Sequence, residues 1–207
     1  MKVYFVRHGE TELNSKKMHQ TSDTPLGKNG ESQAKFVGER FRSIMIDKII
    51  ASSYTRAHQT AMEIEKATGK ELILSDLFIE RKNPSLYQGK LHDEPSLEPT
   101  KKLIESKMDD PLFHHSDEEN FHDILKRADN AISFIIDQKV ENLAVVSHGF
   151  FLRAIISRMI FQDTLTPSVF RRYHDGVKHT NTGISVLEYI DNKWRILTLN
   201  DYAHLGE

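Results

Sequence analysis

Short apolar runs alternate with amphipathic stretches along this chain. Runs rich in aromatic and β-branched residues predict buried strands at 2–6, 47–51, 71–74 and 142–146, with a C-terminal hairpin at 184–189 and 193–199 around Asp191-Asn192. Apolar residues at every third or fourth position predict helices at about 28–42, after Ser53 as an N-cap, at 121–138 and after residue 149. This alternation predicts a three-layer α/β/α sandwich with a mostly parallel sheet and an antiparallel strand near the C-terminus.

Two stretches depart from this pattern. Residues 90–119 carry three prolines (Pro95, Pro99 and Pro111), many charges and little apolar periodicity, which indicates an excursion from the core. We therefore expect one α/β domain over residues 1–207 with a small inserted cap at about 80–119. Residues 161–178 show no clear pattern and are predicted to be irregular.

Composition narrows the partners that we expect. The chain has 207 residues, a hydrophobic content of 38%, a charged content of 28% and a net charge of −2, typical of a globular protein without affinity for nucleic acid or membranes. Its five apolar residues before Arg7 are too few for a signal peptide, so we expect a cytoplasmic protein. There are no cysteines, which excludes thiol chemistry and disulfides. The oligomeric state stays open.

The first strand delivers reactive residues to one edge of the sheet. It ends at Arg7-His8-Gly9, and ligands of open α/β sheets bind outside the carboxyl ends of the strands. Arginine offers a fork of donors that suits a phosphate, histidine can be a nucleophile or a base, and glycine admits close approach of a ligand. Alone, this tripeptide would also fit an ordinary loop.

A second strand repeats the arrangement. The run at 142–146 ends at Ser147-His148-Gly149 and is followed by a helix. Two strands that deliver a histidine to the same edge indicate a site more strongly than either strand alone. Arg56 adds to this hypothesis, because it lies in the first turn of the helix after Ser53, where free backbone N–H groups favour an anion. Alone, Arg56 would be interpreted as a surface residue.

Other residues have two interpretations each. Glu80 follows an apolar pair and is either a general acid held partly out of water or a member of an ion pair. Asn14 can reach the same site or stabilise a local turn. Gln20 and Thr21, with His19, can line a pocket or lie in a solvated loop.

Clusters of basic residues and histidines have simpler explanations. Arg171, Arg172, Lys178 and His179 indicate a solvated basic loop, with a phosphate-facing edge as the alternative. The histidines of the excursion and its flank match no common metal-site spacing (His92, His114, His115 and His122). We expect no metal and no cofactor.

Five segments, in order, resemble one known family. The sequence is similar to the histidine phosphatase superfamily, in the branch that contains cofactor-dependent phosphoglycerate mutases and related phosphatases. The similar segments are Arg7-His8-Gly9-Glu10-Thr11, Thr24-Pro25-Leu26 with Gly30 and Gln33-Ala34, Ser52 to Ala61, Ser147-His148-Gly149, and Asn181-Thr182-Gly183. The resemblance runs from Lys2 to about Tyr189, except for residues 90–119.

The resemblance implies a role for each of these residues. His8 would take a phosphoryl group as phosphohistidine, while Arg7, Arg56 and His148 would surround the phosphate as a ring of cations. Glu80 would protonate the leaving oxygen and then help a water molecule attack. Further contacts would come from Asn14 and the backbone at Gly149, with Gln20 and Thr21 at the phosphate site. Such electrostatic stabilisation needs no metal.

The loop after Glu80 departs from the mutase pattern. Mutases typically follow this glutamate with an aromatic residue and glycines, whereas here Arg81 to Gly89 includes Pro84. This favours a metal-independent phosphatase for phosphomonoesters, acting on a small phosphorylated metabolite and releasing inorganic phosphate. A phosphoglycerate mutase and a catalytically silent phosphate-binding or interaction module are the alternatives. Sugar phosphates, nucleotides, phosphoglycerates, cofactor-precursor phosphates and phosphoproteins all remain open as substrates.

Overall fold

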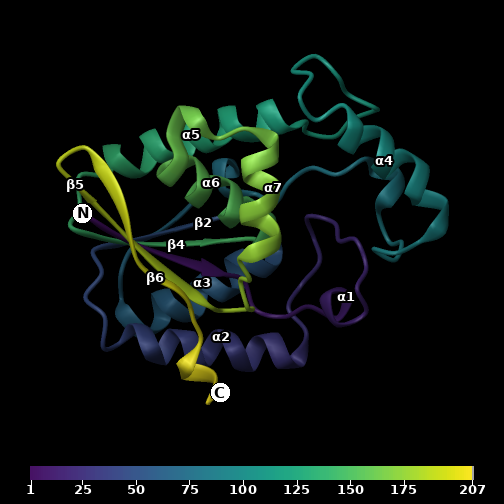
Figure 1. Ribbon diagram of the computed structural model, residues 1–207. Helices are drawn as coiled ribbons and strands as arrows, with labels where there is room; N and C mark the ends of the chain where they lie inside the picture. Colours follow the sequence, from purple (N-terminus) through teal and green to yellow (C-terminus); the bar gives the residue numbers. More distant parts are fainter. Residues whose placement is uncertain (207) are drawn as a thin grey trace.

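A six-stranded sheet forms the centre of the protein in a computed structural model that describes residues 1–206 (Figure 1). The strands are β1 (Lys2–Arg7), β2 (Lys48–Ala51), β3 (Leu72–Leu74), β4 (Asn142–Ser147), β5 (Ile184–Ile190) and β6 (Lys193–Asp201), in the spatial order β3-β2-β4-β1-β5-β6. The first four strands are mutually parallel, β5 pairs antiparallel with β1, and β6 pairs antiparallel with β5. The predicted mixed sheet is confirmed.

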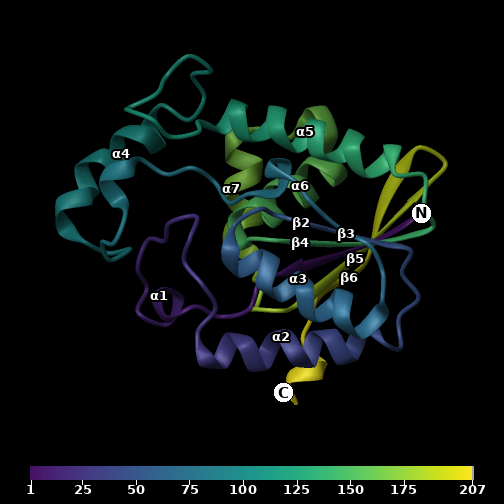
Figure 2. The same cartoon turned by 180° about the vertical axis from the view of Figure 1, so that it is seen from behind.

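Helices cover both faces of this sheet (Figures 1 and 2). On one face α2 (Lys28–Phe41) and α3 (Thr55–Thr68) pack, and on the other α5 (Phe121–Asp137) and α6 (Gly149–Phe161), with α7 (Pro167–Gly176) against α6. Two separate apolar clusters therefore lie above and below the strands, which gives the three predicted layers.

Burial on both faces explains why the sequences of the central strands are almost continuously apolar. In β4, the side chains from Leu143 to Val146 are fully buried, because helices cover both faces. Helix α5 instead buries one face, at Phe121, Ile124, Ala128, Ala131 and Ile135, and begins at a capping box formed by Asn120 and Asp123. The hairpin turn at Asp191 and Asn192 has positive φ at both residues, as its sequence predicts.

Two local predictions were wrong. Residues 161–178, expected to be irregular, contain a 3-10 turn (Gln162–Thr164) and the helix α7. The Thr166 side chain caps α7, Pro167 starts it, and Phe170 is buried, so a short helix forms from a narrow apolar face. Ser53 is not the N-cap of α3: Tyr54 takes that position, and the Ser53 hydroxyl bonds to Asp76.

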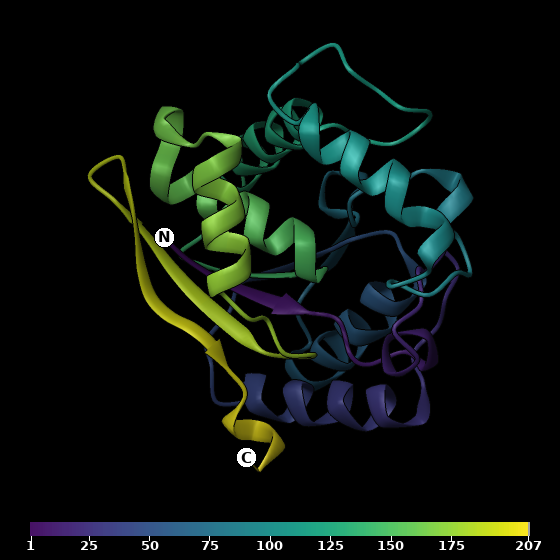
Figure 3. The ribbon, with the colours of Figure 1, turned by 45° about the vertical axis from the view of Figure 1, so that its right-hand side comes forward.

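The long segment after β3 leaves the sheet at the carboxyl ends of the parallel strands. Beyond a 3-10 turn at Asp76–Phe78, it contains two more 3-10 turns (Ser85–Tyr87 and Pro95–Leu97) and α4 (Glu98–Ser106). In Figures 1 and 3, α4 lies beyond the arrowhead of β1, on the same side as α1 (Glu12–Ser15). Backbone hydrogen bonds between His19 and both Gly89 and Lys90 join this segment to the loop after β1.

The chain closes with β6 and a 3-10 turn (Ala203–Leu205). Among residues 1–206, no helix is both long enough and apolar enough to cross a membrane.

Candidate active site

The register of the sheet brings the two histidines together. Arg7 pairs with Ser147 across β1 and β4, so the next residues, His8 and His148, leave the sheet side by side. Their ring centroids are 5.0 Å apart. The His8 backbone N–H also donates to the Ser147 carbonyl (2.9 Å), which keeps the two strand ends level beyond the last ladder pair.

The hydrogen bonds of His8 define its tautomer. Nδ1 lies 2.7 Å from the Gly9 carbonyl oxygen, which can only accept, so Nδ1 carries the proton. Nε2 accepts from the Arg56 Nε–H (3.3 Å) and therefore holds a lone pair. Burial, with Arg56 and Arg7 nearby, keeps the pKa of His8 well below its usual value. The imidazole is neutral, as a nitrogen nucleophile must be.

His148 is enclosed more tightly than His8. Its side chain is fully buried, Nε2 lies 2.8 Å from the Ser52 hydroxyl, and Nδ1 has no hydrogen-bond partner among residues 1–206. Burial, with the neighbouring Arg56 charge, holds the pKa of His148 well below its usual value. Both effects act against the imidazolium form that the resemblance implies for this ring around the phosphate.

Two arginines supply the positive charge beside His8. Arg56 donates from Nη1 to the Thr21 carbonyl (2.8 Å), and burial lowers its pKa to about 10, so the guanidinium stays protonated at neutral pH. Arg7 donates from Nη1 to the His179 carbonyl (2.7 Å), while its buried Nε has no partner in residues 1–206. Both groups therefore lie beside the imidazole with N–H donors available for an anion.

Glu80 is held by backbone amides at the start of α6. Its Oε1 accepts from the N–H groups of Phe151 (3.0 Å) and Arg81 (2.9 Å), and its Oε2 accepts from Phe150 (3.2 Å). Within residues 1–206 the carboxylate forms no ion pair, so the alternative considered from the sequence does not describe it. The first turn of a helix has free N–H groups and a positive dipole end, which favour a carboxylate there.

These side chains surround a cleft of about 1120 Å³. Residues from the sequence-predicted set that line the cleft are Arg7, His8, Asn14, Gln20, Thr21, Arg56, Glu80 and Gly149. His148 is absent from this lining, and its ring lies beside that of His8. The cleft also extends along the 80–119 segment, where basic, acidic and aromatic side chains alternate.

Both roles considered for Asn14 and Gln20 are compatible with the geometry. Asn14 completes a capping box with Thr11 at the start of α1 and also lines the cleft. Gln20 accepts a hydrogen bond from the Thr11 hydroxyl (2.9 Å) and lines the cleft as well. Thr21 contributes its carbonyl to Arg56, so the loop after β1 fixes the arginine.

Comparison with known proteins identifies this arrangement. Residues 3–202 match the histidine phosphatase superfamily (branch 1). The chain belongs to the histidine phosphatase superfamily. It is 28% identical to a protein of Salmonella arizonae named "Probable phosphoglycerate mutase GpmB", over 99% of this chain and 95% of the relative.

Solved histidine phosphatase structures share the fold. Bacillus stearothermophilus YhfR superposes with a TM-score of 0.83 at 23% identity, covering 99% of this chain and 98% of YhfR. A phosphoserine phosphatase from Entamoeba histolytica, solved in complex with 3-phosphoglyceric acid, superposes with a TM-score of 0.80 at 23% identity and the same coverage. These superpositions show that the chain shares their fold.

Several residues of this histidine phosphatase site lie in the segments that resemble the family but have no role that the sequence predicts, because their signals are local and ordinary. Ser52 bonds to His148, and the Thr60 hydroxyl accepts from the Gly9 N–H (3.0 Å). Asn181, noted only as part of a late turn, donates from its side chain to the His8 carbonyl (2.9 Å). A serine after a strand and a threonine on a helix occur throughout proteins, so only the fold shows what they hold.

The basic residues near the C-terminus divide between several places. Arg171 lines the cleft and pairs with Glu105, whereas His179 is buried and its carbonyl anchors Arg7. Arg153, not singled out from the sequence, also lines the cleft and bonds to the carbonyls of Gly149 and Val177. Within residues 1–206, no group of three or more histidine, aspartate or glutamate side chains could hold a metal ion.

Proposed function

We propose that this histidine phosphatase hydrolyses phosphomonoesters through a phosphohistidine on His8, without a metal. The observation that carries the proposal is the state of the His8 ring: neutral, with Nδ1–H committed to the Gly9 carbonyl and the Nε2 lone pair beside Arg56 in the cleft. This orientation supports an attack by Nε2 on phosphorus.

In the first step, the P–Nε2 bond forms as the bond between phosphorus and the ester oxygen breaks. Negative charge on the equatorial oxygens would be met by Arg7 and Arg56, whose buried guanidinium groups act in a site of low dielectric constant. His148 backs the His8 ring and, being neutral, contributes a hydrogen-bonding nitrogen at Nδ1. Two fixed cations take the part that a metal ion has in other phosphatases.

Glu80 supplies the proton to the leaving oxygen. Its Oε1 uses both lone pairs on amides, while Oε2 accepts a single amide and keeps one lone pair for a proton. After proton transfer, the same oxygen would take a proton from the water molecule that attacks phosphorus. The N–P bond then breaks, and inorganic phosphate leaves with His8 restored.

The 80–119 segment acts as the cap of this site and sets the choice of substrate. Its side chains line part of the cleft. In Figure 3 the segment lies beyond the arrowhead of β1, on the side of the sheet where the strand ends carry the reacting groups. A volume of about 1120 Å³ accommodates a small phosphorylated metabolite. The cleft combines cations, carboxylates and aromatic rings. We therefore expect a leaving group that has both polar and apolar parts.

Trapping the intermediate tests the proposal. Wild-type protein incubated with a ³²P-labelled phosphomonoester should acquire a label that is stable in base and labile in acid, and peptide mapping should place it on His8. Chelators should leave turnover unchanged, whereas vanadate should inhibit as a mimic of five-coordinate phosphorus. A label on another residue, or activity lost in a chelator and restored by a divalent ion, would overturn this mechanism.

A phosphoglycerate mutase is the second candidate, favoured by the name of the Salmonella relative. Both activities would use the same phosphohistidine, but a mutase returns the phosphoryl group to a glycerate instead of water. Steady release of inorganic phosphate from 3-phosphoglycerate without bisphosphoglycerate identifies the phosphatase. Formation of 2-phosphoglycerate that requires bisphosphoglycerate identifies the mutase.

A further inference from the structure

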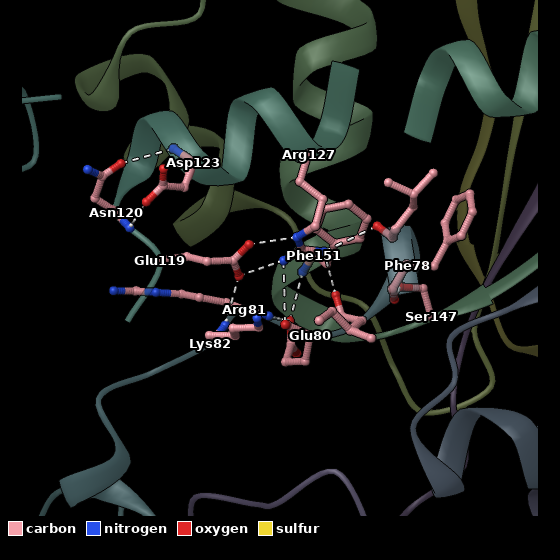
Figure 4. Close-up of polar contacts among 12 residues, drawn as sticks. Phe78, Glu80, Arg81, Lys82, Glu119, Asn120, Asp123, Arg127, Ser147 and Phe151 are labelled. Carbon is pink, nitrogen blue, oxygen red and sulfur yellow. Dashed lines mark hydrogen bonds and ion pairs between the residues drawn. The ribbon is translucent and has the colours of Figure 1, made fainter. Parts of the chain in front are cut away.

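Arg127, on α5, uses all of its side-chain donors around the backbone that carries Glu80 (Figure 4). Nη1 donates to the carbonyls of Ile79 (2.8 Å) and Leu77 (3.2 Å), and Nη2 lies 3.5 Å from the carbonyl of Glu80. Nε and Nη2 also form a two-point ion pair with Glu119, at 2.7 and 2.8 Å. The guanidinium therefore binds three backbone carbonyls in the segment that leads into Glu80.

Glu119 connects Arg127 to both ends of the cap segment. Its Oε2 accepts from the Lys82 N–H (2.9 Å), and its own N–H donates to the Lys82 carbonyl (3.0 Å). Residues 82 and 119 are thereby held together next to Glu80, as Figure 4 shows. The ion pair is largely shielded from water, since the Arg127 and Glu119 side chains are only 12% and 14% exposed.

The same guanidinium contacts the element that holds the Glu80 carboxylate. Its central carbon lies 4.0 Å from the centroid of the Phe151 ring, and the Phe151 N–H is one of the amides that bind Glu80. A cation over an aromatic face at this distance is attractive. Arg127 thus links the backbone of Glu80 to the first turn of α6, the two parts that must stay in register for the carboxylate to keep its place.

We propose that Arg127 is a positioning residue that holds the Glu80 carboxyl group at the leaving oxygen, with Glu119 as its partner. This inference rests on the function proposed above, in which Glu80 is the proton donor. Neither residue was singled out by the sequence analysis, because one arginine in an amphipathic helix and one glutamate before that helix carry no sequence signal. Arg127 itself does not line the cleft in the part of the chain that the structure describes, so its influence on the reaction passes through Glu80.

A kinetic test compares two leaving groups. An alkyl phosphate leaves as a basic alkoxide that needs a proton, whereas nitrophenolate is stable as an anion. Glu80→Gln should slow phosphoenzyme formation from an alkyl phosphate by ~10²–10⁴-fold, the usual worth of general acid catalysis, and from p-nitrophenyl phosphate far less. Arg127→Met should reproduce this selectivity in weaker form, with a loss of at least ~10-fold on the alkyl substrate alone, and Arg127→Lys should recover part of it.

The chain offers a matched control. Arg158 on α6 forms a similar two-point pair with Asp129 on α5, at 2.7 and 3.2 Å, away from the cleft. Arg158→Met removes the same atoms and a comparable ion pair, so it should slow both substrates equally or not at all. Single-turnover measurements are needed, because Glu80 also assists the later attack by water.

Amide hydrogen exchange supplies a readout that is independent of activity. The Phe150 and Phe151 N–H groups lie in the first helical turn and bond to the Glu80 carboxylate, so their protection reports its position. Exchange at both should accelerate at least tenfold in Arg127→Met and stay unchanged in Arg158→Met. Unchanged protection, or equal slowing of the two substrates by Arg127→Met while Glu80→Gln is selective between them, would overturn the proposal.

The experiments also distinguish two further outcomes: a variant that does not fold, and a Glu80 that is not the acid. If Arg127→Met does not fold, Arg127→Lys is judged by the same two measurements, since an ammonium group can still occupy part of the site. If Glu80→Gln shows no leaving-group selectivity while exchange responds to Arg127, the role of Glu80 as an acid fails but its positioning by Arg127 stands.

Discussion

Two strands of this sheet end in the same dipeptide, and the two copies are used differently. After β1, the ring of His8 lines the cleft with an available Nε2 lone pair; after β4, the ring of His148 is enclosed and its Nε2 is bound to Ser52. The glycines differ as well. Gly9 packs against the backbone of Gly30, whereas Gly149 begins α6 beside Arg7.

This difference shows that the chemistry of a histidine depends on what satisfies its ring nitrogens. A carbonyl at Nδ1 leaves Nε2 of His8 nucleophilic, while a hydroxyl at Nε2 of His148 removes that nitrogen from reaction. Both rings are neutral and adjacent. The two histidines occupy equivalent positions at the ends of neighbouring strands. Their different hydrogen-bond partners give them different roles.

Removal of the nucleophile should have the largest effect. His8→Ala is expected to lower turnover by at least ~10⁴-fold, as loss of a nucleophile does in other covalent mechanisms. The fold should survive, because residue 8 lies beyond the last pair of β1. Steady-state assays and thermal melting check both points; substantial turnover in a folded variant would assign the nucleophile elsewhere.

Removal of the second histidine should slow the enzyme without preventing phosphorylation. We expect His148→Ala to reduce phosphoenzyme formation by ~10²–10³-fold, a size typical for one stabilising hydrogen-bonding group. The ³²P label should still appear on His8. If the label is lost altogether in a folded protein, or if it moves to another residue, the division of roles between the two rings is wrong.

The glycines should separate stability from activity. A Cβ at residue 149 would lie 3.3 Å from the Arg7 Nε, so Gly149→Ala should displace that guanidinium and lower kcat/KM by roughly tenfold. A Cβ at residue 9 would lie 2.6 Å from the Gly30 carbonyl oxygen, so Gly9→Ala should destabilise the fold by ~1–3 kcal/mol. Denaturant melts and kinetics on both variants measure the contrast, which would disappear if each variant lost both properties equally.

In the dependence of stability on pH, the two histidines should behave alike. Burial lowers the pKa of both rings, so below about pH 6.5 the unfolded chain binds protons that the folded one does not. Stability is therefore complete above that pH and falls as the pH decreases, by ~1.4 kcal/mol per pH unit for each such ring. His8→Ala and His148→Ala should each flatten the slope, measured by urea unfolding between pH 6.5 and 5; a variant with the wild-type slope would show that its histidine is protonated in the folded state.

The sequence was most informative where a residue follows a strand directly. Arg7, His8, His148 and the first turn containing Arg56 could be placed at one edge because parallel strands end on the same side of a sheet. The state of each ring could not be predicted, since it depends on Ser52, which is 96 positions from His148 along the chain, and on the direction of the Gly9 carbonyl, which the backbone conformation sets. The charge that the resemblance implies for His148 therefore stays a prediction.

The periphery was harder to predict for a different physical reason. Helix α7 has a narrow apolar face, and the support of Glu80 comes from carbonyls and amides, which every sequence contains. Glu119 lies eight residues before Arg127 and precedes the start of α5, so the i,i+3 and i,i+4 spacings of a helix do not relate them. Glu119 is held in place by its backbone bond to Lys82, a contact that the sequence does not show. Such contacts are visible only in the folded chain.

The closure of the chain at Lys82 and Glu119 has a consequence for how this scaffold can change. Because the two residues are hydrogen-bonded to each other, the segment between them begins and ends at one place. Its length can therefore change without moving the strands. Extending a loop whose ends are already joined costs little in chain entropy. Segments exchanged between relatives at residues 82 and 119 would change the lining of the cleft without moving Arg127, and those that keep the backbone bonds to His19 would also leave the loop that fixes Arg56 in place.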